Sequence, residues 1–168
     1  MGIFMFFFEK GGVMALAERV KTFLELQGVN YQLVSHPRSL SSKQTAAAAH
    51  VQEDHIAKAV VYEDEEGLLM VVLPGDQWVK VKSLERELNR ALTQVEENRL
   101  KDLFPDCVIG AIPPLGNVYG METVVDEVLN SLANIYFEAG DHEHLVLVKG
   151  EDFRRLVSGA RHGHFSHA

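Results

Sequence analysis

The sequence predicts an α/β (α+β) domain in which a mixed, barrel-like β-sheet is surrounded by helices. Segments with apolar residues at helical spacing are interspersed with short, β-rich apolar runs. Several of these runs are joined by short turns, which favours a mixed sheet or barrel over a doubly wound parallel sheet. The 168-residue chain has no internal repeat, no low-complexity linker and no shift in composition, so we expect one domain.

The N-terminus carries an apolar stretch of about eight residues, far short of the roughly 20 needed to span a bilayer. It lacks the basic start and the small-residue cleavage site of a signal peptide. We therefore expect residues 1–12 to be an extension, with Met14 as an alternative start, and we expect a cytoplasmic protein without a membrane partner.

The domain itself is predicted over residues 13–158. Apolar residues from Val13 to Leu24 recur three and four apart, as on one face of a helix, and Gly28 is suited to follow its end. The next run, Tyr31–Val34, is predicted as a strand that stops at His36.

A second helix is predicted to begin at Ser41, because Ser41 and Gln44 match a capping box. The helix is mostly alanine, and small residues let helices pack closely. After it, Asp54 is expected to cap a short turn that leads to Lys58.

A β-hairpin is predicted from two β-rich runs, Ala59–Tyr62 and Leu68–Leu73, separated by the acidic turn 63–67. The second run is apolar throughout, which predicts a strand covered on both faces. The segment 74–76 ends it.

The remaining elements follow from the same patterns. Ser83 is expected to cap a helix that runs to Leu92. The other predicted elements are a helix over 96–104, strands over 108–112, 121–125, 134–139 and 144–148, and a closing helix over 151–157.

Residues 159–168 are predicted to form a flexible, solvated tail that contains His162, His164 and His167. The alternative is a loose metal site, which would require the tail to become ordered. His142 and His144 lie near a turn, and the sequence does not fix which face either one takes.

Composition excludes several functions. The net charge of −8 argues against a protein that grips long DNA duplexes, but it is compatible with contact to an RNA end. The single cysteine, Cys107, cannot form an internal disulfide, and we expect a small buried hydrophobe in preference to a nucleophile. Phosphate-binding loops, dinucleotide fingerprints and zinc motifs are absent, so no cofactor or metal is predicted.

Two segments carry residues that could act in binding or catalysis, at positions where such residues are unusual. Lys58 opens an apolar strand at the rim of the predicted core, where it can hold a phosphate or polarise a carbonyl. The alternative is a lysine that extends its ammonium to water. The segment from Gly110 to Gly116 contains Pro113 and Pro114, and such a rigid loop can present N–H groups to a ligand or serve as a plain turn.

Lys58, followed about fifty residues later by Gly110-Ala111-Ile112-Pro113-Pro114, resembles the pattern of the YbaK / prolyl-tRNA-synthetase-associated editing family. The resemblance runs from about residue 14 to residue 157. It is supported by Gly75-Asp76, Val124-Val125-Asp126, Ala139-Gly140 and Glu151-Asp152-Phe153, in this order.

The resemblance implies a mixed β-barrel with surrounding helices and hydrolysis, in trans, of the ester of mischarged tRNA. It implies a tRNA acceptor end as partner and leaves open a synthetase partner. In this mechanism a ribose hydroxyl helps to activate water, and the protein mainly positions the ester.

Site residues carried over from the family begin with Lys58, as the catalytic group that holds the terminal phosphate or the ester carbonyl. Backbone N–H groups of Gly110, Ala111 and Ile112 would orient the aminoacyl group. The other substrate-binding residues expected are Pro113, Pro114, Gly116, His36 and Gly140.

Two departures from the family pattern bear on specificity. Ala59 follows the lysine, where a hydroxyl or amide residue is common, and Glu138 stands where a small polar residue or histidine is common. Glu138 either faces solvent or pairs with the α-ammonium group of the substrate. The edited amino acid is therefore not predicted.

Alternatives to the deacylase are a non-catalytic module that binds a tRNA end or a synthetase, and a hydrolase of small esters. A basic stretch, which either contacts tRNA phosphates or forms a solvated helix face, consists of Lys80, Lys82, Arg86 and Arg90.

Overall fold

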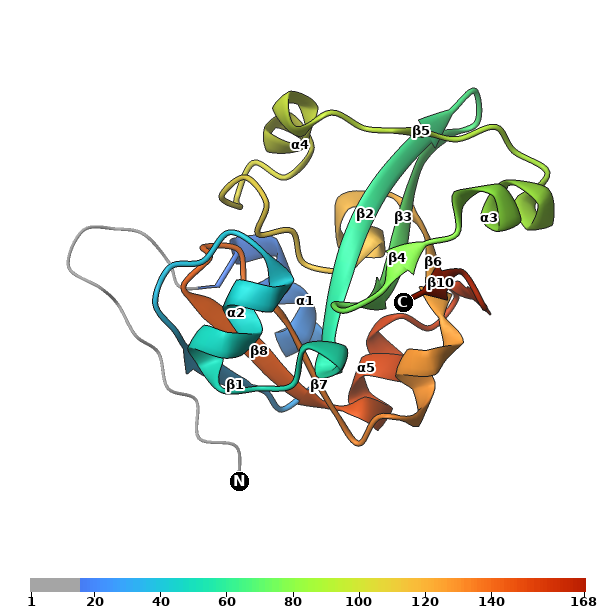
Figure 1. Ribbon diagram of the computed structural model, residues 1–168. Helices are drawn as coiled ribbons and strands as arrows, with labels where there is room; N and C mark the ends of the chain where they lie inside the picture. Colours follow the sequence, from blue (N-terminus) through green and yellow to red (C-terminus); the bar gives the residue numbers. More distant parts are fainter. Residues whose placement is uncertain (1–15) are drawn as a thin grey trace.

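The computed structural model describes residues 16–168 (Figure 1). Its strands are β1 (Gln32–Ser35), β2 (Ile56–Asp64), β3 (Gly67–Pro74), β4 (Trp78–Val79), β5 (Thr93–Gln94), β6 (Glu122–Asp126), β7 (Asn134–Glu138), β8 (His144–Lys149), β9 (Arg161–Gly163) and β10 (Ser166–His167). Its α-helices are α1 (Glu18–Leu26), α2 (Ser42–Ala49), α3 (Val81–Leu88), α4 (Glu97–Leu103) and α5 (Gly150–Leu156). Short 3₁₀ turns are η1 (Glu53–His55), η2 (Gly116–Tyr119) and η3 (Glu127–Ser131).

An eight-stranded mixed sheet forms the centre, in the order β1-β8-β7-β2-β3-β6-β9, with β5 beside β2. The pairs β2–β7, β3–β6 and β6–β9 are parallel, and the others are antiparallel. The predicted mixed sheet with helices outside is therefore confirmed. The order ends at β1 and β9, so no pairing within residues 16–168 closes it into a barrel.

The central strand β3 is covered on both faces, as its apolar run predicts. Leu69–Leu73 have no exposed surface. Met70 and Val72 belong to the large core cluster that also contains residues of α1 and α5. Leu69 and Val71, on the other face, pack in a cluster with Leu84 of α3.

The second face of the sheet carries two separate apolar clusters. One contains Ile56 and Leu145 and lies under α2, with Ala46 in contact. The other lies under α3 and the C-terminal segment, with Leu84 and Phe165. Figure 1 shows α2 and α3 on opposite sides of β2.

Two predicted elements of the N-terminal half are confirmed. Ser41 caps α2, since its Oγ accepts a hydrogen bond from Gln44 N at 3.2 Å. The predicted hairpin forms, since β2 pairs with β3 in antiparallel fashion up to Asp64 and Gly67. The predicted extension 1–12 and the start of the first helix at Val13 lie outside the described residues.

Two predicted caps are wrong. Asp54 lies inside η1, whose N-cap is Gln52, and its carboxylate contacts His55 Nδ1 at 2.7 Å. Ser83 lies inside α3, which begins at Val81 because Leu84 N already donates to the carbonyl of Lys80. In both places the incoming strand or turn, and not a local hydroxyl or carboxylate, fixes where the helical turn begins.

The strand predicted over 108–112 is also wrong, because this segment is a loop. Val108 N donates to Gly140 O at 2.7 Å and Ala111 N donates back to Val108 O at 3.0 Å. These bonds satisfy the backbone locally, so the segment does not join the sheet.

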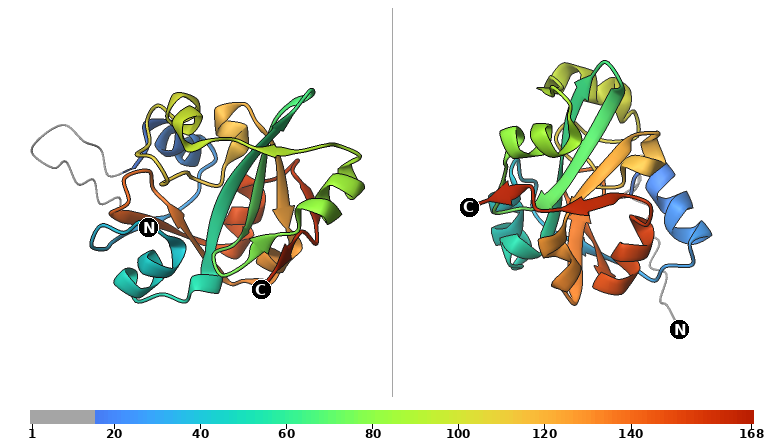
Figure 2. Two further views of the ribbon diagram at one scale, coloured as in Figure 1. Left: turned by 45° about the horizontal axis from the view of Figure 1, so that its top comes forward. Right: turned by 90° about the vertical axis from the view of Figure 1, so that its right-hand side faces the viewer.

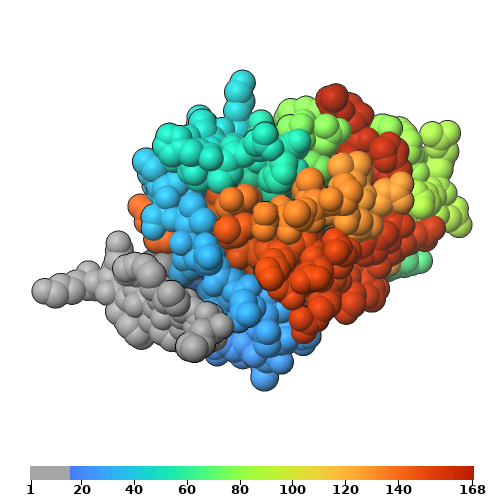
Figure 3. Space-filling view, turned by 90° about the horizontal axis from the view of Figure 1, so that it is seen from below, coloured from blue at the N-terminus to red at the C-terminus, as the bar shows by residue number. Residues whose placement is uncertain are grey.

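The flexible tail predicted for residues 159–168 is wrong. Here β9 pairs in parallel with β6, and β10 pairs in antiparallel fashion with β4. Figures 2 and 3 show this C-terminal segment in red, packed against the body of the molecule. Phe165 has no exposed surface, so burial of an aromatic ring fixes a segment whose histidines and glycines indicate a loop.

Asp126 anchors this segment and is itself fully buried. Its Oδ1 accepts from Val128 N at 3.0 Å and its Oδ2 accepts from Phe165 N at 3.0 Å. A buried carboxylate requires such donors, because without them its desolvation is strongly unfavourable.

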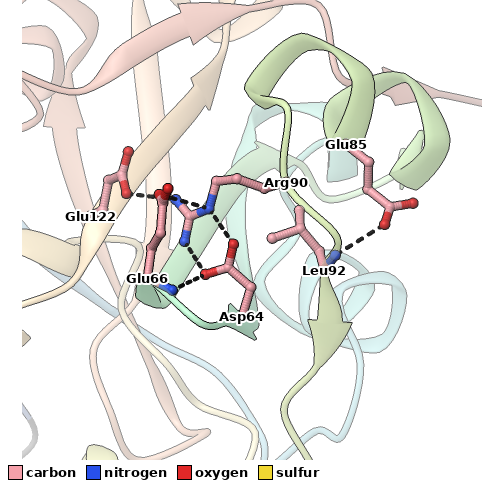
Figure 4. A network of polar contacts seen from close by, with 6 residues as sticks. All are labelled: Asp64, Glu66, Glu85, Arg90, Leu92 and Glu122. Carbon is pink, nitrogen blue, oxygen red and sulfur yellow. Dashed lines mark hydrogen bonds and ion pairs between the residues drawn. The ribbon is translucent and has the colours of Figure 1, made fainter.

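Arg90 forms ion pairs at the turn end of the β2–β3 hairpin (Figure 4). It makes a bidentate contact with Asp64, at 2.7 Å for both bonds, and contacts Glu122 Oε2 at 2.7 Å. The guanidinium lowers the pKa of Asp64 to about 2. Its side chain is only 5% exposed and lies beyond the end of α3, so neither alternative given for Arg90, contact with tRNA phosphates or a solvated helix face, is correct.

No helix in the described part of the chain is long and apolar enough to cross a bilayer.

Replacing Asp126 with Asn should lower the free energy of unfolding by about 1–3 kcal/mol, because an amide offers one acceptor oxygen where two backbone N–H donors need partners and that of Phe165 is buried. Urea denaturation measures this, and limited proteolysis should show earlier cleavage after residue 158. The matched control is Glu127→Gln at the exposed neighbouring position. Equal stability of Asp126→Asn and the wild type would contradict the anchoring role.

Candidate active site

Lys58 lies on β2, in the strip between the two apolar clusters. Strand alternation puts it on the same face as Ile56, which packs under α2, and Val60, which packs in the cluster of α3. Its ammonium donates to Gly75 O at 3.0 Å. Burial lowers the pKa of Lys58, and the negative charges of Glu53 and Asp76 oppose this shift.

The turn after β3 holds the acceptor of Lys58 in place. Gly75 N donates to Ile56 O at 2.7 Å, and a Cβ atom on Gly75 would lie 2.7 Å from Glu53 O. Only glycine fits at this approach. Lys58 therefore has a fixed position with one of its three N–H donors satisfied by the backbone.

Glu138 ends β7, the parallel neighbour of β2. The last paired residues are Ala57 and Phe137, so Lys58 and Glu138 are the next residues of adjacent parallel strands and lie on the same face. Glu138 Oε2 is buried and has no hydrogen-bond partner within residues 16–168. The solvent-facing alternative for Glu138 is therefore wrong.

The pKa of Glu138 is raised to about 7, first by burial and then by the negative charge of Asp141. A hydrogen bond from the side chain of Thr45 opposes the shift. Thr45 in turn contacts Ser39, with 2.6 Å between the two hydroxyl oxygens. Glu138 is a buried carboxyl group next to the strand that carries Lys58, and one of its oxygens has no hydrogen-bond partner among residues 16–168. Such a carboxyl group is typical of a binding site.

His36 is buried after β1, and its backbone N donates to Glu143 O at 2.8 Å. Its Nδ1 lies 2.8 Å from Pro37 O, so this nitrogen carries the proton and donates. In the neutral ring Nε2 is then an acceptor, and it has no partner in the described part of the chain.

His142 holds the predicted ligand loop. Its Nε2 lies 2.6 Å from Ile109 O and donates to it, which leaves Nδ1 as a second buried acceptor without a partner among residues 16–168. A Cβ atom on Gly110 would lie 3.0 Å from this Nε2, and Gly110 has φ +85°. Glycine at this position therefore lets the histidine approach the loop.

The residues of the loop from Gly110 to Gly116 differ in whether their backbone N–H groups are free to bind a ligand. The N–H groups of Gly110 and Ile112 have no hydrogen-bond partner within residues 16–168, and Gly110 is exposed. The N–H of Ala111 is used by Val108 O, so the prediction that it orients a ligand is wrong. Pro113 and Pro114 are buried and fix the path of the chain.

Two predicted ligand-binding glycines are packed against protein atoms. A Cβ atom on Gly116 would lie 2.2 Å from Thr123 Oγ1, and one on Gly140 would lie 3.1 Å from Ala17 Cβ. Gly140 has φ +122°, and its carbonyl accepts from Val108 N. Both glycines therefore position the loop and its neighbouring turn.

Cys107 is not a reactive thiol. Its Sγ lies 3.4 Å from Tyr119 Oη, and burial raises its pKa to about 12. Cys107 is only partly buried, and its raised pKa fits the prediction that it is not a nucleophile. Within residues 16–168, no group of three or more histidine, cysteine or acidic residues is arranged to hold a metal ion.

The sequence profile of the aminoacyl-tRNA editing domain matches residues 36–156. The chain belongs to the aminoacyl-tRNA editing domain family. The matched range contains every residue of the candidate site from His36 to Gly140. A role in tRNA editing, in the general sense of this family, follows from the match.

Solved structures share the fold of this editing domain. Hypothetical protein APE2540 is 22% identical, with 89% of this chain and 100% of that chain covered and a TM-score of 0.79. A "putative trans-editing enzyme for prolyl tRNA synthetase" is 23% identical, with 90% and 97% covered and a TM-score of 0.78. A "putative signal transduction protein" from Marinobacter aquaeolei VT8 is 21% identical, with 89% and 30% covered and a TM-score of 0.71. No curated protein matches the chain.

Sequence reasoning missed Ser39 and Thr45, the buried hydroxyl pair beside Glu138. The available signal was a single threonine in a helix that is otherwise mostly alanine on its inner face. A polar side chain at such a position must find a buried partner.

Glu138 makes stability depend on pH. Its folded pKa of about 7 exceeds the ordinary 4.5, so the folded protein binds this proton more tightly than the unfolded chain. Stability from this group is full below about pH 4.5 and is lost as the pH rises through about 7.

Glu138→Gln keeps the shape and removes the titration. Its stability relative to the wild type should rise by on the order of 2 kcal/mol between pH 4 and pH 8, as measured by urea denaturation. Glu143→Gln, an exposed carboxyl of the same turn, should show a constant difference. A constant difference for Glu138→Gln would refute the buried, proton-binding carboxyl.

Proposed function

We propose that this editing domain is an aminoacyl-tRNA deacylase that hydrolyses the ester of mischarged tRNA in trans. The observation that carries the proposal is that Lys58 and Glu138 directly follow the last paired residues of β2 and β7, on one face of the sheet and inside the matched family range. A cation and a partly buried acceptor at one corner of the sheet suit a substrate that carries a phosphate and an ammonium group.

Lys58 would hold the anionic side of the substrate. Gly75 O takes one of its three N–H donors, so two remain for the terminal phosphate or the ester carbonyl. Partial burial strengthens either contact, because the ammonium has lost part of its water shell.

Glu138 would hold the α-ammonium group of the aminoacyl moiety. Its Oε2 is an unpaired buried acceptor, and binding of an ammonium would favour the ionised carboxylate over the protonated form. His36 Nε2 supplies a further buried acceptor that has no partner in the described part of the chain. An ammonium has three N–H donors, so a site with several unpaired acceptors suits it.

The hydrolytic step needs few protein groups. Water adds to the ester carbonyl carbon, the bond from this carbon to the ribose oxygen breaks, and a proton passes to that oxygen. By family resemblance, a ribose hydroxyl of the terminal adenosine would help to activate the water. The free N–H groups of Gly110 and Ile112 would orient the aminoacyl group, so that the protein acts mainly by positioning.

The proposed partners are the acceptor end of a mischarged tRNA and, for delivery, a synthetase. A structural neighbour described as a "putative trans-editing enzyme for prolyl tRNA synthetase" supports this choice. A cytoplasmic location belongs to the same proposal, since aminoacyl-tRNA is used there.

Deacylation of a panel of mischarged tRNAs tests the proposal. The wild type should release the amino acid from one or a few species, and Lys58→Ala should slow release about 100-fold or more by removing a charge at the reacting ester. The control is Lys101→Ala, which removes an exposed lysine on α4. Failure to release any amino acid, with synthetases present, would favour the non-catalytic binding module.

The role of Glu138 is tested by comparing aminoacyl-tRNA with N-acetyl-aminoacyl-tRNA, which lacks the ammonium group. The wild type should deacylate the acetylated substrate at least about 10-fold more slowly, which is the cost of leaving a buried charge unpaired. In Glu138→Gln the two substrates should react at similar rates, whereas Glu143→Gln should behave as the wild type. Unchanged deacylation of the free-amine substrate by Glu138→Gln would exclude this role.

A further inference from the structure

Trp78, the only tryptophan of the chain, is 67% exposed beside the candidate active site. The ammonium of Lys58 lies 5.0 Å from the centre of its ring. A lysine at this distance contacts the electron-rich face of the indole. The proposed catalytic cation and an exposed aromatic ring therefore form one surface.

The backbone under Trp78 is held firmly. Trp78 pairs with His167 and Val79 pairs with Ser166, as β4 joins β10. Lys80 N donates to Phe165 O at 2.6 Å, and Phe165 N donates to the buried Asp126. Exposure of Trp78 is thus a property of a pinned strand and not of a loose loop.

The neighbourhood of the ring favours a flat ligand that carries a negative charge. Lys58 keeps two N–H donors for an anion, next to a ring whose large apolar surface faces water. Nucleobases stack on aromatic side chains whatever their sequence, and a lysine beside the ring suits the phosphate of the same nucleotide. Glu53 and Asp76 lie near the same ammonium, so a phosphate would bind Lys58 in competition with these carboxylates.

We propose that Trp78 is a stacking platform for an unpaired nucleobase at the 3′ end of an RNA strand, with Lys58 holding a phosphate of the same end. This inference rests on the proposed function and assigns the nucleotide side of its site. It divides the substrate between two surfaces: the base lies on Trp78, and the aminoacyl group lies towards Glu138.

Uncharged RNA tests the platform without any deacylation. The probe is a short single-stranded RNA that ends in CCA with a free 3′ hydroxyl, and the signal is the fluorescence of the single tryptophan. We expect saturable quenching whose apparent affinity falls as salt is raised. The same RNA with an abasic 3′-terminal nucleotide should bind about 5- to 100-fold more weakly, the range of base stacking on an aromatic ring.

Variants identify the ring as the contact, with labelled RNA and fluorescence anisotropy as the readout. Trp78→Ala should weaken binding about 5- to 100-fold, and Trp78→Phe should recover part of the loss. Leu40→Ala, at an apolar residue that is 78% exposed on another segment, is the control and should not change affinity.

Equal affinity of the wild type and Trp78→Ala for the CCA probe would overturn the proposal, as would equal affinity for the intact and abasic ends. If RNA binding is unaffected but binding of a purified synthetase is lost in Trp78→Ala, the ring is a protein contact and the proposal is wrong. Deacylation is measured separately, so a chain that binds the RNA end without hydrolysing the ester keeps this inference and loses only the proposed function.

Discussion

Burial of Leu69–Leu73 on both faces of β3 requires cover on each side of the sheet, and the arrangement of that cover produces the site. Each of these side chains contributes about 1.5–3 kcal/mol when removed from water. On one face a single large apolar cluster covers the strand. On the other face α2 and α3 cover separate clusters, and Lys58 occupies the strip between them. A register shift of one residue would turn Lys58 into the large core, so the same packing that stabilises the sheet fixes the position of the cation.

The sequence was a good guide wherever local chemistry and strand alternation agree. The apolar run of β3, the hairpin that it forms with β2 and the Ser41 cap are each determined within a few residues, and each was predicted correctly. The errors share a cause. The segment 108–112 and the C-terminal residues 161–167 take their conformation from distant partners, Gly140 in the first case and Asp126 in the second. Hydrogen bonds between residues far apart in the chain leave no periodic pattern in either segment.

For the candidate site, single residues could be predicted from the sequence, but their arrangement in space could not. Lys58 could be selected because a lysine at the rim of an apolar strand is unusual, and Glu138 because it departs from the family pattern. Their adjacency depends on the parallel pairing of β2 with β7, which joins residues eighty positions apart. The buried hydroxyl pair of Ser39 and Thr45 and the link from His142 to Ile109 depend on the same kind of long-range packing. Individual residue types therefore indicate the chemistry, whereas the topology decides which of them meet.

A chain of contacts connects the stability of the fold to the surface beside Lys58. Asp126 holds Phe165, the segment around Phe165 holds β10, and β10 pairs with the strand that carries Trp78. The first link is a hydrogen bond from a backbone N–H to a buried carboxylate, and the last is strand pairing, so a change at the first link can reach the last. The residues of the C-terminal segment need not contact a substrate to affect its binding, because they determine whether the indole ring is presented next to the ammonium. Positioning of this kind is what a site requires when the substrate supplies part of the chemistry and the protein supplies mainly geometry.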